Sequence, residues 1–173
     1  MWGWIMAELD DLKSSFLDGM SRSAASVSVV TTDGPAGRGG VTVSAMTSIS
    51  ADGERPTMLM CLNASASTLP LVLENGCFCI NVLRIGQTDI SDVFSSRVPA
   101  PGGDKFNAVE FEVLATGAPY LSAALVGFDC RLISAERHGT HHICIGAVET
   151  VRVAHEGEPL LYGMRRYLRA ETH

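Results

Sequence analysis

From Ala25 onward the helical spacing of apolar residues gives way to short strand-like segments, and this change limits the fold more than any other feature. Strand-like segments such as ASVSVVTTDG, TMLMCLN, CFCINVL, AALVGFDCRLISAERHG and HHICIGAVETVRVAH follow one another with only short helical stretches between them. At least six strands at such close spacing are typical of an antiparallel barrel or sandwich. We therefore predict a mainly β, antiparallel fold with a few flanking helices.

An amphipathic helix is predicted before this pattern begins. Leu9, Leu12 and Phe16 recur at spacings of three and four, which places them on one face of a helix. A chain of 173 residues is long enough for one domain with a full core and short for two. We therefore expect residues 1–21 to form a helix that packs on one barrel domain of residues 22–173.

Two shorter helices are expected between the strands. In STLPLVLENG, Ser67 is a plausible N-cap and Gly76 a plausible stop. A second helical stretch surrounds TDISDVFSSR, whereas the C-terminal PLLYGMRRYLRAETH is predicted to be an exposed tail or a short strand.

The charge balance narrows the range of partners. The net charge is −6 and no cluster of Lys and Arg offsets it, which argues against nucleic acid. No apolar run approaches the length of a membrane span, and the N-terminus carries acids where a signal peptide would be basic. We therefore expect a cytoplasmic protein that binds neither nucleic acid nor membrane, with its five cysteines as buried free thiols.

Few charged residues are available to cover the surface. They make up 18% of the chain, whereas hydrophobic residues make up 46%. One small barrel cannot bury so much apolar surface alone, so part of it is expected to be covered by a partner subunit or a ligand. We therefore expect a homodimer.

The segment GRGGVTVSAMTSIS combines small residues with hydroxyl groups. In a continuous strand one face would carry Thr42, Ser44, Met46, Ser48 and Ser50. Such a face is either the solvent side of an ordinary strand or a flat surface that suits a planar polar ring such as a flavin.

The segment NASASTLP places polar side chains at a turn from strand to helix. Backbone N–H groups and the positive end of a helix favour an anion there, and a phosphate is the obvious candidate. Simple N-capping is the alternative. Arg97 and Lys105 flank a nearby glycine-rich loop, where they are either further phosphate partners or solvated charges.

The segment GTHHICIG places two histidines side by side at the start of a predicted strand. Adjacent strand residues point to opposite faces, so His141 and His142 are expected to differ in role. Zinc binding together with His138 is poorly supported, because no second group of ligands stands at the usual spacing. A structural histidine is the other interpretation, and we predict no metal site.

Taken in order, eight segments resemble the short-chain flavin reductase family, the reductase partners of two-component flavin monooxygenases. They are SVSVVTT, GVTVSAMTSIS, MLMCLNASAST, FCINVL, DKFNAVEF, GAPYLSAALVGFDC, GTHHICIGAV and PLLYGMRRY. The resemblance implies an antiparallel Greek-key split barrel that binds FMN, a homodimer, and reduction of FMN or FAD by NADH or NADPH. The reaction expected is hydride transfer from nicotinamide to flavin, which needs the two rings stacked in contact.

The resemblance also implies roles for particular positions. The isoalloxazine ring would be lined by Thr42, Val43, Ser44, Ala45, Met46, Thr47 and Ser48. The ribityl phosphate would be held by Asn63, Ala64, Ser65, Ser67 and Thr68. The loop that closes on the flavin would contain Lys105 and Phe106, with Arg97 as a further partner.

His141 is the catalytic candidate, because the family has a histidine near the nicotinamide side of the flavin at this position. Thr140 stands where the family usually has an aspartate, and Gly163 stands where it usually has an aromatic residue. The loss of the aspartate removes a carboxylate that could orient or charge His141.

Two other functions remain open at this point. Reductases that keep their flavin and pass electrons to the cobalt of a corrin, cob(II)yrinic acid a,c-diamide, are similar to the same family. A non-enzymatic split barrel that binds flavin or haem is the alternative of another class. The downstream electron acceptor, a monooxygenase or a corrin, is not fixed by the sequence.

Overall fold

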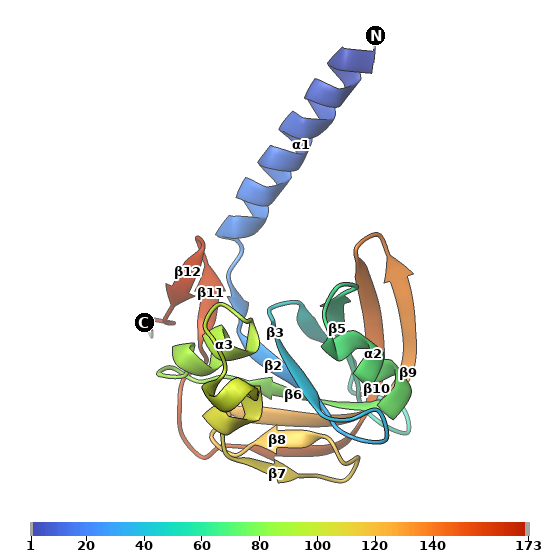
Figure 1. Cartoon of the computed structure of the whole chain (residues 1–173), viewed down its shortest axis with the longest axis vertical. Coiled ribbons are helices and arrows are strands. Elements are labelled where there is room, and N and C mark those ends of the chain that lie inside the picture. The colour runs from blue at the N-terminus through green and yellow to red at the C-terminus, as the bar shows by residue number, and fades with distance from the viewer. Residues whose placement is uncertain (1, 172–173) are drawn as a thin grey trace.

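The computed structural model describes residues 2–171, with side chains from residue 9 onward (Figure 1). The helices are α1 (Trp2–Arg22), α2 (Thr68–Asn75) and α3 (Thr88–Phe94), with short 3-10 turns η1 (Pro101–Gly103) and η2 (Lys105–Ala108). The first strands are β1 (Ala25–Ser26), β2 (Ser28–Thr32), β3 (Gly39–Val43), β4 (Met46–Ser50), β5 (Thr57–Asn63) and β6 (Cys77–Val82). The later ones are β7 (Phe111–Val113), β8 (Pro119–Leu121), β9 (Val126–His138), β10 (His141–Val153), β11 (Leu161–Gly163) and β12 (Arg166–Leu168).

Seven strands form the main sheet in the order β3-β2-β6-β9-β10-β5-β4, and every neighbouring pair is antiparallel. Its two edge strands, β3 and β4, are consecutive in the chain and are separated only by Ser44 and Ala45. Three residue steps span at most about 11 Å, so the edges must approach each other and the sheet must curl. Ala45 is held on the β4 side of the barrel, since its carbonyl accepts a hydrogen bond of 2.9 Å from Cys61 N on β5, the strand that pairs with β4. The predicted mainly β, antiparallel barrel is confirmed.

The curled sheet separates two apolar clusters. Val29 and Val30 are adjacent on β2 and belong to different clusters, because successive side chains of a strand point to opposite faces. The cluster that contains Val30 is tightly packed around Phe78, which is fully buried. A β-carbon at Gly146 on β10 would lie only 2.4 Å from Phe78 Cζ, so only glycine fits at this crossing.

The other cluster lies between the sheet and the elements that cover it. Leu83, Phe94, Phe106 and Leu121 pack there, so α3, η2 and the β7–β8 hairpin cover this face of the sheet (Figure 1). Of the two alternatives predicted for the C-terminal segment, the short strand is found: β11 and β12 form a hairpin whose first strand pairs with β1.

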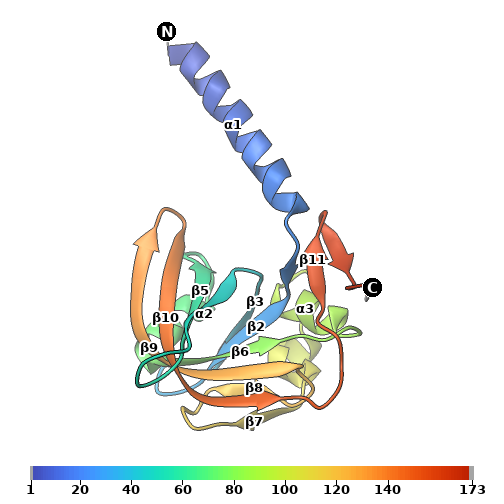
Figure 2. The ribbon, with the colours of Figure 1, turned by 180° about the vertical axis from the view of Figure 1, so that it is seen from behind.

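The N-terminal helix forms as predicted, but its expected packing on the barrel of the same chain is not found. Both views show α1 extending away from the sheet (Figures 1 and 2). The side chains of Leu12 and Phe16 are 66% and 63% exposed. The helix is amphipathic, and β1 begins only three residues after it ends at Arg22. Its apolar side chains from Leu9 to Met20 remain exposed because they do not contact the barrel. Within residues 2–171, none of the helices is long and apolar enough to cross a membrane.

The hydroxyl-rich segment is not one continuous strand. The alternation expected from Thr42 to Ser50 is interrupted at Ser44 and Ala45, where the chain passes from β3 at one edge to β4 at the other. The expectation of a single face from Thr42 to Ser50 is therefore wrong. The physical reason is barrel closure, which needs a sharp turn at this point.

Candidate functional site

A cavity of about 320 Å³ lies where the start of β3 faces α2 and η2, and we call it the lysine cavity. It is lined by Arg38, Gly39, Gly40, Ser67, Thr68, Leu71, Gly103, Asp104, Lys105 and Phe106. Two segments that the sequence analysis connected with phosphate, the start of α2 and the glycine-rich loop before Phe106, therefore meet in space. The meeting point is β3, to which neither segment is close in sequence.

Glycines form the β3 wall of the lysine cavity because its neighbours leave no room for side chains. A β-carbon at Gly39 would lie 2.6 Å from Leu71 Cδ1, and one at Gly40 would lie 2.5 Å from Phe94 Cε1. The backbone of β3 is thus close to both α2 and α3. A wall of exposed backbone allows a ligand to approach closely.

Lys105 is held in place by carbonyl groups. Its Nζ donates hydrogen bonds to the carbonyl of Phe94 at 2.8 Å and to the carbonyl of Gly40 at 3.4 Å. An ammonium has three N–H donors, so one remains for a ligand. Burial lowers the pKa of the Lys105 ammonium. An anion in the cavity would oppose that effect by favouring the charged form.

The sequence analysis did not identify Arg38 as a site residue. Its guanidinium lies 4.6 Å from the ring centroid of Phe106 and forms a 3.4 Å ion pair with Asp104. Asp104 also caps η2 by accepting a hydrogen bond of 2.9 Å from Phe106 N. Arg38 stands in the segment GRGG, directly before the two glycines that form the β3 wall of the cavity.

The two serines in the turn before α2, Ser65 and Ser67, differ in whether their hydroxyl groups are hydrogen-bonded within the turn. Asn63 Oδ1 accepts hydrogen bonds from Ser65 N at 2.9 Å and from Ser65 Oγ at 2.7 Å, so Ser65 is used to shape the turn. Ser67 occupies the N-cap position of α2, but its side chain makes no capping hydrogen bond. Ser67 therefore stands at the predicted N-cap position, but the predicted capping hydrogen bond is absent. The Ser67 hydroxyl remains available to a ligand in the lysine cavity.

His141 lies beside this turn. It pairs with Asn63 across β10 and β5, and Ala64 N donates a hydrogen bond of 2.9 Å to the carbonyl of Thr140. His141 is exposed, and its Nδ1 lies 3.0 Å from Thr140 Oγ1. Threonine thus occupies the place of the family aspartate and still contacts the imidazole.

His142 is in a different environment from its neighbour. It is half-buried, and its Nδ1 is buried with no hydrogen-bond partner. The predicted difference between the two histidines is therefore present in the structure. No group of three His, Cys, Asp or Glu side chains suited to a metal ion occurs among the described residues.

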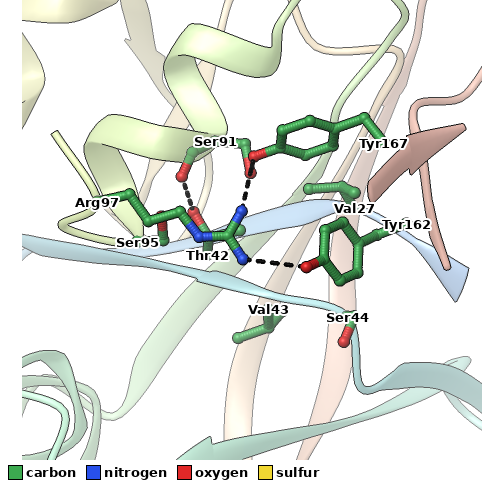
Figure 3. A pocket seen from close by; sticks show the side chains of 9 residues that line it. All are labelled: Val27, Thr42, Val43, Ser44, Ser91, Ser95, Arg97, Tyr162 and Tyr167. Carbon is green, nitrogen blue, oxygen red and sulfur yellow. Dashed lines mark hydrogen bonds between the residues drawn. The ribbon is translucent and has the colours of Figure 1, made fainter. Parts of the chain in front are cut away.

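A second cavity, of about 160 Å³, lies where the end of β3 meets α3 and the β11–β12 hairpin, and we call it the arginine cavity (Figure 3). Its lining residues are Val27, Thr42, Val43, Ser44, Ser91, Ser95, Arg97, Tyr162 and Tyr167. Thr42 Oγ1 donates a hydrogen bond of 2.8 Å to the carbonyl of Ser91, which fixes α3 against β3.

Arg97 is surrounded by the hydroxyl groups of two tyrosines (Figure 3). Its Nη2 donates to Tyr162 OH at 3.3 Å, and its Nη1 donates to Tyr167 OH and to Asp92 Oδ1, both at 3.5 Å. The hydrogen bond to Tyr162 is the main cause that raises the pKa of Arg97, so the guanidinium is permanently charged. Tyr167 OH donates a short hydrogen bond of 2.6 Å to Asp92 Oδ1. Burial, followed by this hydrogen bond, raises the pKa of Tyr167.

Nine of the predicted site residues line three cavities around β3. Ser67, Thr68, Lys105 and Phe106 meet in the lysine cavity, and Thr42, Val43, Ser44 and Arg97 meet in the arginine cavity. Ala45 lines a third cavity of about 360 Å³ together with Ser44, Tyr162, Gly163 and Arg165. None of these three cavities is lined by Met46, Thr47, Ser48, Asn63, Ala64, Ser65 or His141.

Tyr162 and Tyr167 were missed as site residues, although they stand in the quoted segment PLLYGMRRY. Their rings meet edge to face with centroids 5.6 Å apart, and both hydroxyl groups reach Arg97. The expectation of an exposed tail or a lone short strand did not indicate their role. Only the pairing of β11 with β1 and β12 brings them to β3.

The sheet that closes through Ser44 and Ala45, with cavities along its glycine-rich edge strand, defines the class of the protein as a split β-barrel. The chain belongs to the family of flavin reductase like domains, whose family model matches residues 20–171. The family predicted from the sequence is confirmed.

Two curated relatives illustrate the similarity. FMN reductase (NADH) RutF 2 of Methylorubrum extorquens strain PA1 is 42% identical over 154 residues, covering 89% of this chain and 87% of the relative. FMN reductase (NADH) RutF of Stutzerimonas stutzeri strain A1501 is 39% identical over 156 residues, covering 90% of this chain and 87% of the relative.

Solved structures agree with the sequence comparison. Flavin reductase PheA2 has a TM-score of 0.82 at 26% identity, covering 92% of this chain and 98% of PheA2. The styrene monooxygenase flavin reductase of Pseudomonas putida S12 has a TM-score of 0.79 at 26% identity, covering 91% of this chain and 98% of that reductase.

Proposed function

We propose that the protein is an NADH-dependent FMN reductase that transfers a hydride from reduced nicotinamide to FMN. The observation that carries this proposal is the meeting of Ser67, Thr68 and Lys105 around the glycine wall of β3, which continues directly into Thr42–Ser44. The arrangement suits a ligand with a phosphate at one end and a planar ring at the other. The relatives named FMN reductase (NADH) support the same substrates.

The lysine cavity is the proposed phosphate site. Lys105 has one donor that is not used by the protein, and the Ser67 hydroxyl is free of a capping role. Arg38 adds a second cation, oriented by Asp104. Hydrogen bonds in which one partner is charged are the strong ones, so these groups fit a phosphate better than a neutral ligand.

The ring is proposed to lie along the turn from Thr42 to Ser48. When bound, FMN supplies the atom that accepts the hydride, and the protein supplies orientation and access. No side chain needs to gain or lose a proton in that step, and the one carboxylate that lines the two cavities, Asp104, is paired with Arg38. His141, beside the Asn63 turn, is the residue proposed to contact the nicotinamide.

The acting form is proposed to be a homodimer. The apolar face of α1 contains the exposed side chains Leu9, Leu12, Phe16, Leu17 and Met20. Its 21 residues extend about 30 Å, and a helix in a protein gains most of its stability from the packing of such an apolar face. A second copy of the chain, whose barrel also exposes apolar strand residues such as Ile133 and Val153, would cover it.

The reduced flavin is proposed to serve a separate monooxygenase. Structural relatives support this, since one is the flavin reductase component of a bacterial two-component tryptophan halogenase and another is the styrene monooxygenase flavin reductase of Pseudomonas putida S12. Five free thiols fit the reducing cytoplasm, where NADH is available.

The proposal is tested by steady-state oxidation of NADH with FMN, FAD, riboflavin and a cobalt corrin as separate acceptors. The expected result is rapid turnover with FMN at catalytic protein concentration. Fast reduction of the corrin with slow turnover of free FMN would identify a corrin reductase instead. Flavin binding without NADH oxidation would identify a non-enzymatic barrel.

A further inference from the structure

Arg97 lies apart from the residues proposed to hold the FMN phosphate. The arginine cavity shares no lining residue with the lysine cavity, and it contains Thr42, Val43 and Ser44 from the stretch proposed for the ring. The guanidinium therefore faces the ring end of the ligand rather than its phosphate end. The positive charge of Arg97 beside the proposed ring position therefore has a role other than phosphate binding.

The protein orients Arg97 without using all of its donors. Its hydrogen bonds to Tyr162, Tyr167 and Asp92 are 3.3–3.5 Å long, and its side chain remains 52% exposed. A guanidinium has five N–H groups in a fixed plane. The plane is further held by the Tyr162 ring, whose centroid lies 5.3 Å from the guanidinium carbon (Figure 3). Donors are thus left for an acceptor inside the cavity.

We propose that Arg97 binds the pyrimidine edge of the flavin ring and thereby favours the reduced flavin over the oxidised one. This inference rests on the proposed FMN reductase function. Transfer of one hydride from NADH gives NAD⁺ and brings two electrons and one proton to FMN, so the ring gains one negative charge. That charge is carried by the pyrimidine half of the ring, and a fixed cation beside it stabilises the reduced form.

Asp92 acts as a positioning residue with an opposing charge. Its carboxylate accepts the 2.6 Å hydrogen bond from Tyr167 and lies 3.5 Å from Arg97 Nη1. It therefore anchors the β11–β12 hairpin on α3, and its negative charge partly offsets the guanidinium. Replacing Asp92 by Asn keeps the shape and removes that charge, so it should strengthen the preference for reduced flavin.

The experiment compares the dissociation constants of oxidised and reduced FMN, measured anaerobically by titration of the wild type and four variants. Arg97→Gln should weaken binding of reduced FMN at least tenfold more than binding of oxidised FMN. A tenfold change in this ratio corresponds to about 30 mV in the reduction potential of a two-electron couple. Arg97→Lys should keep most of the preference, and Asp92→Asn should increase it. Lys105→Gln is the matched control, because it should weaken both redox forms equally.

Two results would overturn the inference while the proposed function stands. One is an equal loss of oxidised and reduced FMN in Arg97→Gln together with an unchanged ratio in Asp92→Asn. The other is a loss in Arg97→Gln that affects FMN and leaves riboflavin unchanged, which would assign Arg97 to the phosphate. If the wild type binds no flavin in either redox state, the proposed function fails first, and this inference fails with it.

Discussion

Arg97 and Lys105 are close in the sequence, yet they line cavities that have no residue in common. Lys105 Nζ is bound to the carbonyls of Phe94 and Gly40 near the start of β3, whereas the Arg97 guanidinium lies between two tyrosines near its end. The edge strand therefore connects two cationic sites of different character. One is lined by glycine backbone and Phe106, and the other by two tyrosines and several further hydroxyl groups.

Removal of the Ser67 hydroxyl should weaken FMN far more than riboflavin. A hydrogen bond to a charged group contributes about 1.5–3 kcal/mol, so Ser67→Ala together with Lys105→Gln should reduce FMN affinity tenfold or more. Riboflavin has no phosphate and should be affected less than twofold. Titration of both ligands checks this, and equal losses would move the phosphate site out of the lysine cavity.

Ser65→Ala is the matched control for that comparison. The Ser65 hydroxyl donates to Asn63 Oδ1 and lines none of the three cavities. A loss of FMN affinity larger than that of Ser67→Ala would show that the exposed turn, rather than the start of α2, holds the phosphate.

The advantage of FMN over riboflavin should decrease as the pH rises. Burial lowers the pKa of Lys105, so in the free protein the ammonium loses its proton at a lower pH than an ordinary lysine. Below that pKa the charge is present and favours the phosphate, and above it the attraction is lost. Binding measured across alkaline pH checks this, with Lys105→Arg as the variant whose ratio stays constant.

His141→Ala should slow reduction of bound flavin or raise the KM for NADH, while His142→Ala should mainly lower stability. The reason is that His141 is exposed beside the Asn63 turn, whereas His142 is half-buried with one ring nitrogen out of contact with water. Stopped-flow reduction and thermal unfolding of both variants separate the two effects. An unchanged rate in the first variant with a slow rate in the second would reverse the assignment.

A charge on the apolar face of α1 should separate the proposed dimer. Phe16 is 63% exposed in the single chain, so Phe16→Asp should leave the barrel folded and shift sedimentation from dimer to monomer at micromolar concentration. Ser14→Asp, a substitution away from the apolar stripe, is the control and should remain dimeric. A wild type that sediments as a monomer while it binds flavin would contradict the proposal.

The barrel could be predicted from the sequence because short strand-like segments follow one another with only short helical stretches between them. The helices were also predictable, and Gly76 ends α2 in the left-handed conformation expected of a helix stop. The break at Ser44 and Ala45 could not be predicted, because small residues alternate through it without a change in pattern. It depends on barrel closure, which brings distant strands together.

The site could be predicted only in parts. Ser67, Thr68 and Lys105 were identified from hydroxyl groups near a helix start and from a cation near glycines, and they do meet in one cavity. Tyr162 and Tyr167 carry no local signal, because their position depends on the pairing of β11 with β1 and β12. The position of Arg97 also depends on that hairpin, so its separation from Lys105 could be found only in three dimensions.

The central claim is tested most directly by one anaerobic turnover. Protein saturated with FMN is mixed with one equivalent of NADH, and the absorbance of oxidised flavin and of NADH is followed together. We predict that both decrease with the same rate and in equal amounts, faster than in a mixture of FMN and NADH without protein. Flavin that stays oxidised on the protein while NADH is unconsumed would contradict the assignment of this chain as an FMN reductase.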